Sequence, residues 1–308
     1  MHEIQKVAVL GAGAMGAYFV TRFFDTPFFK TALVAKEKRY EKLKTNGLIV
    51  NGKQYIIPVI DPETANEPVD LLIVALKHHQ LADAVQGLEK LVGDSTTIIS
   101  VMNGLESEEY IGSIYGMDKM LYATSAGIDA LRVGNKVTYT SPGTHSFGEA
   151  TNKTLSPKVK RVQTAFEKAG IKYKIPEDML RTLWWKFMVN VGVNQASAIT
   201  RMPFGVFQSN KDAQDLMESL MREVVTLANA EGVNLSEQDI VDWYPVMNQL
   251  SPLGKTSMLQ DIEAQQKTEV EIFSGKVISL GKTNNISTPV NQAVFQIIRV
   301  LEQGYGVS

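Results

Sequence analysis

The sequence predicts an α/β domain over residues 1–176, followed by an all-α domain over residues 177–308. Before Pro176, short β-branched and aliphatic runs alternate with helical patterns, as in a sheet with crossover helices. After Pro176, long amphipathic stretches replace these short runs. The length of 308 residues also suits two domains of about 150 residues each.

The first domain begins with an apolar strand, a glycine turn and a helix, which is the start of a βαβ unit. A two-residue turn at Asn51-Gly52 separates two apolar runs and predicts a hairpin over residues 48–60. Thr, Val, Tyr and Gly are frequent over residues 119–149, which indicates several more strands. Further strands are expected at 4–10, 31–35, 71–76, 98–101 and 172–175, and helices at 17–24, 79–91 and 156–169.

The second domain is expected to contain helices only. Ser236-Glu237-Gln238-Asp239 has the pattern of a capping box and opens a short helix. Thr288-Pro289 opens the last helix, with proline at its first position. The long helices are expected at 178–199, 211–231, 258–283 and 289–302.

The composition excludes several classes of protein. The chain has 31 Lys+Arg against 33 Asp+Glu, so no basic surface for nucleic acid is expected. It has no cysteine, which excludes disulfides, thiolate nucleophiles and zinc–thiolate sites, and the spacing of its four histidines predicts no metal site. The sequence contains no stretch of 18 apolar residues, so no membrane span is expected, and its start does not have the pattern of a signal peptide. A cytoplasmic protein is therefore expected.

The segment Gly11-Ala12-Gly13-Ala14-Met15-Gly16 matches the dinucleotide-binding fingerprint. Gly11 allows a tight turn, Gly13 lets backbone amides approach a pyrophosphate, and Gly16 lets the helix pack against the strand. The phosphates would lie at the helix N-terminus, where free N–H groups favour an anion. The alternative is a glycine turn that only joins a strand to a helix.

The end of the second strand lies where a dinucleotide ribose is expected. An acidic residue there suits NADH, whereas a cation suits the 2′-phosphate of NADPH. The sequence is Ala35-Lys36-Glu37-Lys38-Arg39, with Lys36 at the discriminating position. Lys36 therefore predicts NADPH, while Glu37 leaves NADH possible. A solvated turn of mixed charge is the alternative.

Five blocks of the chain resemble the ketopantoate reductase family (2-dehydropantoate 2-reductases). They occur in the order of the family and cover nearly the whole chain. The blocks are Gly11–Gly16; Ala75-Leu76-Lys77; Val101-Met102-Asn103-Gly104; Trp185 to Asn190, extending to Asn194; and Thr256 to Ile262, followed by Thr268-Glu269-Val270, Gly275 and Pro289.

The resemblance implies a Rossmann-like domain and a helical domain with the site in the cleft between them. It implies hydride transfer from a reduced nicotinamide to a 2-keto acid, a small-molecule substrate, in a monomer or homodimer. The preferred reaction is NADPH-dependent reduction of ketopantoate to (R)-pantoate, a step of pantothenate biosynthesis. One alternative is an NAD(P)-dependent D-2-hydroxyacid dehydrogenase for other branched or aromatic 2-keto acids. Another is a regulatory protein that senses a dinucleotide.

The resemblance also assigns roles to individual residues. Lys186 matches the catalytic lysine, and Glu269 matches its acidic partner. The substrate-binding residues are Asn190, Asn194, Ser257 and Asn103, and the residues on the cofactor side are Lys77 and again Asn103.

The chemistry of ketone reduction fits a lysine in this place. Hydride addition builds negative charge on oxygen, which a nearby ammonium group can neutralise and protonate. Lys186, Asn190 and Asn194 recur every four residues and would share one stripe of a helix. The alternative is a solvated polar face.

Simple structural roles are also open for the other candidates. Ser257 could be a helix N-cap, Glu269 a surface charge on a helix, and Asn103 part of a turn after a strand. His78 and His79 are expected in a loop or at the surface.

Overall fold

The structure is a computed structural model that describes residues 3–305. The chain divides into two compact units, Met1–Thr182 (unit 1) and Leu183–Ser308 (unit 2). Unit 1 combines strands and helices, and the described part of unit 2 is helical, so the predicted fold class is confirmed. The domain boundary after residue 176 stays a prediction. Among the described residues, no helix combines the length and apolar character that a membrane span requires.

Unit 1 is built on an eight-stranded sheet with the order β12-β11-β8-β7-β6-β1-β2-β5. The strands from β5 to β8 are parallel, and β11 runs antiparallel to β8. The chain moves from β1 to β2 on one side and to β6 on the other, so strand order reverses at β1. The bounds are β1 Lys6–Leu10, β2 Lys30–Val34, β5 Val59–Ile60, β6 Leu71–Val74, β7 Thr97–Ser100, β8 Met120–Ile128, β11 Pro142–Gly148 and β12 Tyr173–Lys174.

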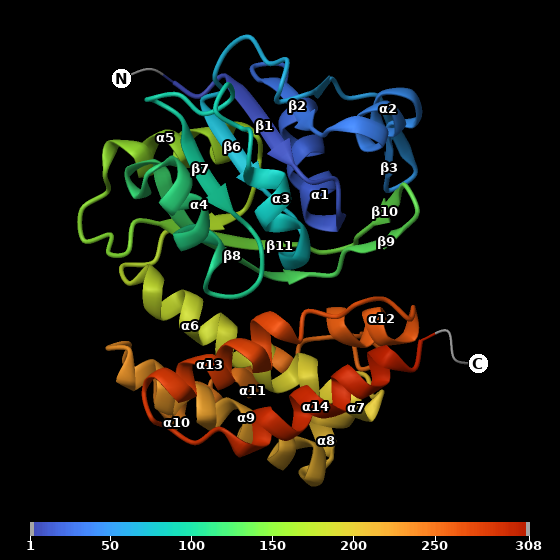
Figure 1. Cartoon of the computed structure of the whole chain (residues 1–308), viewed down its shortest axis with the longest axis vertical. Helices are drawn as coiled ribbons and strands as arrows, with labels where there is room; N and C mark the ends of the chain where they lie inside the picture. The colour runs from blue at the N-terminus through green and yellow to red at the C-terminus, as the bar shows by residue number, and fades with distance from the viewer. Residues whose placement is uncertain (1–2, 306–308) are drawn as a thin grey trace. The chain divides into compact units, whose positions relative to one another are not determined.

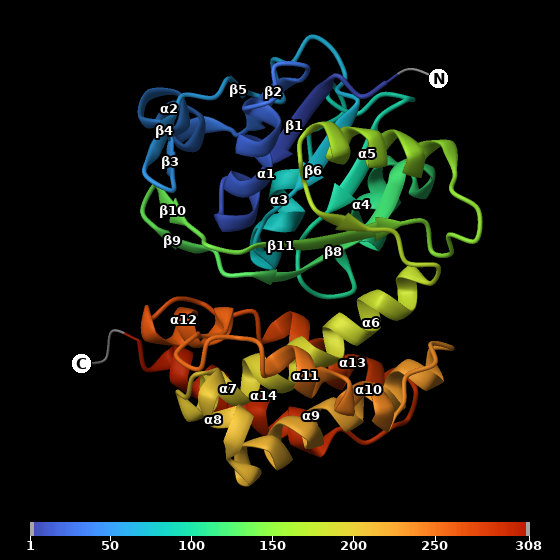
Figure 2. The same ribbon diagram turned by 180° about the vertical axis from the view of Figure 1, so that it is seen from behind.

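Helices cover both faces of this sheet. Helices α1 (Ala14–Phe24) and α5 (Pro157–Lys168) pack on one face, and α5 lies in front of the strands in Figure 2. Helices α3 (Leu81–Val85) and α4 (Ser107–Tyr115) pack on the other face, which is nearer the viewer in Figure 1. Successive residues of a strand point to opposite faces, so alternate residues of β1 enter separate apolar clusters. Both faces being buried explains the continuous apolar runs of the parallel strands.

A smaller sheet has the order β4-β3-β10-β9. Its strands are β3 Leu48–Val50, β4 Lys53–Tyr55, β9 Leu131–Val133 and β10 Lys136–Thr138. Asn51 and Gly52 both have positive φ, as a tight hairpin turn requires, so the predicted hairpin is confirmed at its turn. Its predicted end is wrong, because β5 leaves the hairpin and pairs with β2 in the main sheet.

Three helices of unit 1 differ from the prediction. The helix expected over residues 79–91 is only the 3₁₀ turn η1 (His78–Gln80) followed by α3, and Gly87 with φ 80° lies just beyond it. His78 and His79 lie in η1, partly or fully exposed, as expected. Helices α2 (Glu37–Asn46) and α4 were not predicted. In α2 only Leu43 is buried, so the segment has no apolar stripe that a sequence could reveal.

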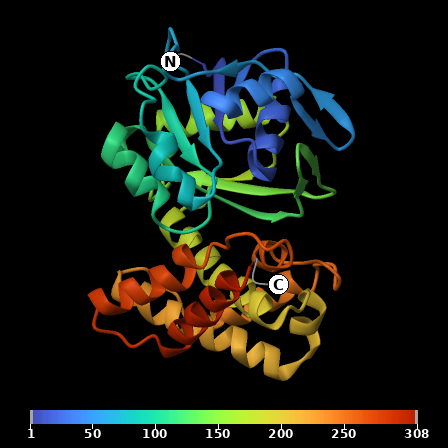
Figure 3. The same ribbon diagram turned by 45° about the vertical axis from the view of Figure 1, so that its right-hand side comes forward.

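Unit 2 is a set of packed helices (Figure 3). Two of its turns are π-helical, η3 Asn190–Asn194 and η4 Glu271–Gly275. The α-helices are α6 Met179–Val189 (which begins in unit 1), α7 Gln195–Thr200, α8 Phe204–Ser209, α9 Lys211–Ala230, α10 Glu237–Val241, α11 Trp243–Met247, α12 Ser257–Glu263, α13 Lys276–Thr283 and α14 Pro289–Gln303.

Two long helices predicted in unit 2 are interrupted. The stretch 178–199 forms α6, η3 and α7, and the stretch 258–283 forms α12, an irregular segment, η4 and α13. Gln265 has φ 52° and ends the helical path after α12. Helices α8 and α11 were not predicted. Both predicted starts are confirmed, because Asp239 accepts the Ser236 N–H at 2.8 Å and Pro289 is the first residue of α14.

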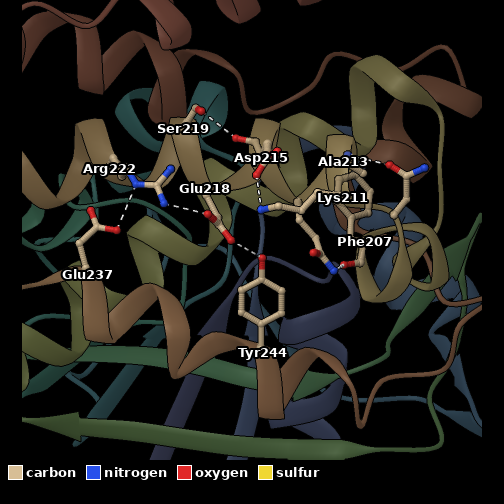
Figure 4. Close-up of polar contacts among 11 residues, drawn as sticks. Phe207, Lys211, Ala213, Asp215, Glu218, Ser219, Arg222, Glu237 and Tyr244 are labelled. Atoms are coloured by element: carbon tan, nitrogen blue, oxygen red, sulfur yellow. Dashed lines mark hydrogen bonds and ion pairs between the residues drawn. The ribbon is translucent and has the colours of Figure 1, made fainter.

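Polar side chains attach α10 and α11 to α9, as Figure 4 shows. The hydroxyl of Tyr244 donates to Glu218, and Arg222 bonds to both Glu218 and Glu237. Trp185 of α6 packs against Trp243 of α11, with ring centroids 6.2 Å apart. The contact between the two tryptophans holds α6, the helix that carries Lys186, against α11. Exposed ion pairs contribute little each, so the aromatic contact is the stronger support.

Two buried ionisable side chains of unit 1 have shifted pKa values, which change the stability of the fold in opposite directions as the pH changes. His145 of β11 packs against the rings of Tyr18 and Phe19, and loss of hydration lowers the pKa of His145 to about 4. Glu108 of α4 accepts a hydrogen bond from the Ser107 hydroxyl at 2.8 Å. Burial nevertheless raises the pKa of Glu108 to about 7. Both groups are therefore held neutral by the fold over mildly acidic pH.

The pH dependence of stability follows from these two pKa values. Unfolded histidine titrates near pH 6.5, so the His145 contribution is lost as the pH falls from 6.5 to 4, by up to about 3 kcal/mol. The Glu108 contribution is present below about pH 4.5 and is lost as the pH rises towards 7. We expect Glu108→Gln to lose stability on acidification from pH 6.5 to 4, and His145→Phe to gain stability on acidification from pH 7 to 4.5. Thermal denaturation across pH measures both slopes, and slopes of equal sign would contradict the assignment.

Candidate functional site

The glycine turn between β1 and α1 has the geometry that the sequence predicts. Gly11 has φ 103°, and a Cβ there would lie 2.3 Å from the Ala75 carbonyl oxygen. A Cβ on Gly16 would lie 1.9 Å from the Gly11 carbonyl oxygen. A Cβ on Gly13 would meet nothing closer than 3.9 Å, so the space in front of Gly13 is open. Two glycines therefore permit close packing, and the third leaves room for a ligand.

The N-terminus of α1 offers backbone donors to an anion. Gly13 is its N-cap, no side chain caps the helix, and its first turn contains no acidic residue. Ala12 is buried, and Ala14 and Met15 are partly buried beside the turn. Uncapped N–H groups and the helix dipole favour a negative charge here. The turn thus fits the pyrophosphate of a dinucleotide.

Three further candidates lie along the same edge of the sheet. The register places the carboxyl ends of β2, β1, β6 and β7 level, with Leu10 opposite both Val34 and Val74. Lys36 follows β2, Lys77 follows β6 and Asn103 follows β7. Ligands of such sheets bind at the carboxyl ends of the strands where strand order reverses. The structure therefore brings Lys36, Lys77 and Asn103 to the edge that holds the glycine turn.

Lys36 is the N-cap of α2, and the three charged residues after it are exposed, so the alternative of a solvated segment of mixed charge stays open. Its ammonium group lies 3.3 Å from a carboxylate oxygen of Glu63 and 3.3 Å from the carbonyl oxygen of Gln86. The side chain of Lys36 remains 33% exposed, and that of Glu63 69%. An ion pair this exposed is weak, so a phosphate could compete for the lysine.

Glu108 supports the Asn103 loop, a role that was not predicted from the sequence. The hydroxyl of Ser100, at the end of β7, lies 2.8 Å from the hydroxyl of Ser107. Ser107 donates to Glu108, whose other oxygen accepts the Ala123 N–H at 3.4 Å. Asn103, partly buried, lies in the loop that these bonds span. The sequence shows a glutamate four residues after Gly104, but only the structure shows that its carboxyl is buried.

Lys186 lies in the last turn of α6, next to the buried side chains of Phe187 and Met188. Loss of hydration lowers the pKa of Lys186 to about 8. Burial is the cause of this shift and sets its direction. A lysine whose pKa lies this near neutrality can give up its proton readily.

Asn190 and Asn194 lie at the two ends of η3, 4% and 8% exposed. The alternative of a solvated polar face is therefore wrong for both. A mostly buried side-chain amide can donate hydrogen bonds to a polar ligand and accept them from it. Because η3 is π-helical, Lys186 and the two asparagines do not lie on one continuous α-helix.

The simple structural roles considered for Ser257 and Glu269 do not hold in the structure. The N-cap of α12 is Thr256, whose hydroxyl accepts the Leu259 N–H at 3.1 Å, so the N-cap interpretation of Ser257 is wrong. Ser257 is the exposed first residue of that helix. Glu269 is buried in the irregular segment before η4, so the surface-charge interpretation is also wrong.

These features define a class of protein. A parallel sheet that reverses at β1, with a glycine turn at that strand, is the architecture of NAD(P)-dependent oxidoreductases. Two family models match the chain, Ketopantoate reductase PanE/ApbA over residues 7–152 and its C-terminal counterpart over residues 178–302. The chain belongs to the ketopantoate reductase family, and it is an NAD(P)-dependent oxidoreductase of the kind that acts on CH–OH groups.

Two relatives match nearly the full length of the chain. The 2-dehydropantoate 2-reductase of Streptococcus pyogenes serotype M6 is 23% identical over 96% of this chain and 97% of its own. That of Halobacterium salinarum is 24% identical over 97% of this chain and 99% of its own.

Solved structures share the fold. D-mandelate dehydrogenase in ternary complex with NADH and anilino(oxo)acetate has a TM-score of 0.88 at 20% identity, covering 97% of this chain and 99% of that one. A ketopantoate reductase from Staphylococcus aureus, described as dimeric, has a TM-score of 0.81 at 22% identity. It covers 98% of this chain and 100% of its own.

Proposed function

We propose that this protein reduces ketopantoate to (R)-pantoate with NADPH, a step of pantothenate biosynthesis. The observation that carries the proposal is Lys186, whose pKa is lowered to about 8 and whose helix, α6, is followed at once by the π-helical turn that holds Asn190 and Asn194. The names of the full-length relatives support ketopantoate as the substrate.

In this proposal Lys186 acts as the general acid. Reduction of a ketone leaves negative charge on the carbonyl oxygen, which the ammonium group stabilises and then protonates. The amides of Asn190 and Asn194 orient the substrate, and the Ser257 hydroxyl binds its carboxylate. Glu269 serves as the acidic partner that keeps the lysine oriented.

On the cofactor side, the N–H groups of Gly11 to Gly16 would hold the pyrophosphate, and Lys36 the 2′-phosphate. Lys77 and Asn103 would contact the nicotinamide end. When bound, the reduced nicotinamide supplies the hydride.

A second candidate is a D-2-hydroxyacid dehydrogenase for other branched or aromatic 2-keto acids. The likeness of its fold to D-mandelate dehydrogenase in complex with NADH favours this candidate. The residues named above handle the shared keto-acid group and do not distinguish the two substrates.

A panel of substrates and cofactors tests the proposal. The purified protein is assayed with NADPH or NADH against ketopantoate, 2-ketoisovalerate and phenylglyoxylate. We expect the highest kcat/KM with ketopantoate and NADPH. A preference for phenylglyoxylate would favour the second candidate, and no turnover with any 2-keto acid would overturn both.

Substitution of Lys36 tests the choice of cofactor. Lys36→Ala is expected to raise the KM for NADPH about tenfold, because a charge opposite the 2′-phosphate is lost. The KM for NADH should stay within about twofold, since NADH lacks that phosphate. Lys42→Ala, which removes an exposed lysine of the same helix, is the matched control. An unchanged KM for NADPH would remove Lys36 from this role.

A further inference from the structure

Two π-helical turns occur at the residues assigned above to the substrate. η3 joins α6 to α7, and η4 begins two residues after Glu269. The carbonyl oxygen of Glu269 accepts the N–H groups of Ile272 and Phe273, at 3.1 and 3.3 Å. π-helical turns are rare in proteins, and those that occur often lie at functional sites. Because an α-helix turns about 100° per residue, one inserted residue rotates the following side chains by roughly that angle.

A single side chain links the two π turns. The amide nitrogen of Gln195 donates to the Val191 carbonyl oxygen at 2.8 Å, which lies in η3. The amide oxygen of Gln195 accepts the backbone N–H of Ser274 at 3.0 Å, which lies in η4. Gln195 directly follows Asn194 in the chain, so it fixes η3 at the end that carries this asparagine.

Buried polar groups complete this link. Asn291 of α14 accepts hydrogen bonds from Gln195 at 3.2 Å and from the Ser274 hydroxyl at 2.9 Å. Its own amide donates to Glu223 of α9 at 2.7 Å. Gln195, Ser274 and Asn291 are each 0% exposed. A fully satisfied buried network holds one arrangement, because any alternative leaves polar groups unpaired.

Packing also restricts the two turns. A Cβ on Gly192 of η3 would lie 2.5 Å from the Met221 side chain and 3.0 Å from the Met217 carbonyl oxygen. Phe187, next to Lys186, lies against Phe273 of η4, with ring centroids 6.4 Å apart. The residues before and after η3 are therefore both held against η4.

We propose that Gln195, with Ser274 and Asn291, is a positioning residue of the reduction site. It holds η3 and η4 in fixed positions relative to each other, and it thereby fixes the positions of Asn190 and Asn194 with respect to Glu269. The inference rests on the proposed function, since the two asparagines and Glu269 have a shared task only if a 2-keto acid binds there.

Gln195→Met in the full-length protein removes the hydrogen bonds while keeping the shape of the side chain. We expect kcat/KM for the 2-keto acid to fall about tenfold or more, because small displacements of binding groups lower rates strongly. The dissociation constant for the non-reducible analogue oxamate should rise by a similar factor, and that for NADPH should stay within about twofold. The matched control is Gln208→Met, since Gln208 also donates two hydrogen bonds within unit 2, to the Met247 and Leu250 carbonyl oxygens.

Combination with Asn194→Ala tests whether Gln195 acts through that asparagine. The double variant should lose no more kcat/KM than the more damaged single variant, since residues that act as a unit are not additive. Should Gln195→Met fail to fold, Ser274→Ala removes one hydroxyl and should show a smaller loss of the same kind.

The outcomes separate the positioning role of Gln195 from the proposed function. Melting temperatures lowered alike in Gln195→Met and Gln208→Met, with kcat/KM unchanged in both, would overturn the positioning role. Additive losses in the double variant, or an unchanged Ser274→Ala, would also overturn it. No turnover by the unaltered protein with any 2-keto acid would instead overturn the proposed function.

Discussion

Lys186→Ala is expected to lower kcat for reduction of a 2-keto acid by about 10³-fold while NADPH still binds. General acids contribute about 10² to 10⁴ to such rates, and here the lysine both stabilises and protonates the oxygen. Cofactor binding should persist, because the glycine turn and Lys36 belong to unit 1. Steady-state kinetics and fluorescence titration with NADPH measure the two effects.

The matched control is Lys282→Ala, which removes an exposed lysine of α13 and should leave kcat unchanged. Equal activity of Lys186→Ala and the control would exclude Lys186 as the acid.

The pH profile gives the same residue a second test. Because the pKa of Lys186 is lowered to about 8, its acid form predominates below pH 8 and is lost above it. We expect kcat/KM for reduction to be level below pH 8 and to fall about tenfold per pH unit above it. Oxidation of the 2-hydroxy acid should show the reverse dependence. Persistence of the alkaline limb in Lys186→Ala would assign it to another group.

Gly16→Ala and Gly13→Ala are expected to have different effects. The added Cβ of Gly16→Ala would lie 1.9 Å from the Gly11 carbonyl oxygen, so backbone must move. Overpacking of this kind lowers the free energy of unfolding by about 1 to 3 kcal/mol, and the loss expected for Gly16→Ala lies at the upper end of this range. Gly13 has φ −72° and ψ −170°, which alanine adopts freely, and its surroundings are open. Gly13→Ala should change stability by less than about 0.5 kcal/mol.

Gly13→Ala should nevertheless weaken NADPH binding by about tenfold or more, because its methyl group would fill the space for the pyrophosphate. Thermal denaturation and titration with NADPH separate the two properties. If Gly13→Ala binds NADPH as well as the unaltered protein, the glycine turn is only a connection between strand and helix.

The sequence predicts the parallel strands and the edge of the sheet well, for a physical reason. Buried strands are continuous apolar runs, and the residues after Leu10, Val74 and Ser100 must then share one edge. Helix α2 was missed because it buries only Leu43 and has no apolar stripe. Helix existence can be read from local periodicity only where one face is buried.

The π turns could not be predicted from the sequence. A spacing of four between Lys186, Asn190 and Asn194 fits an uninterrupted α-helix equally well. The turn at η3 depends on contacts remote in sequence, the Gln195 bonds to Ser274 and Asn291. In the same way, Thr256 and Ser257 are both good capping residues, and only the structure shows which one caps α12.

The buried pair of Glu108 and His145 has a consequence for sequence change over evolutionary time. Between about pH 4.5 and 6.5 their contributions to stability have opposite pH dependence and largely cancel. Loss of either residue alone would leave the pH dependence of the other without this opposing contribution, whereas loss of both would remove the two contributions together. The two residues are remote in the chain, on α4 and β11, and each bonds to a residue of β8, Glu108 to Ala123 and His145 to Ser125. Lineages exposed to changing acidity should therefore keep both residues or replace both.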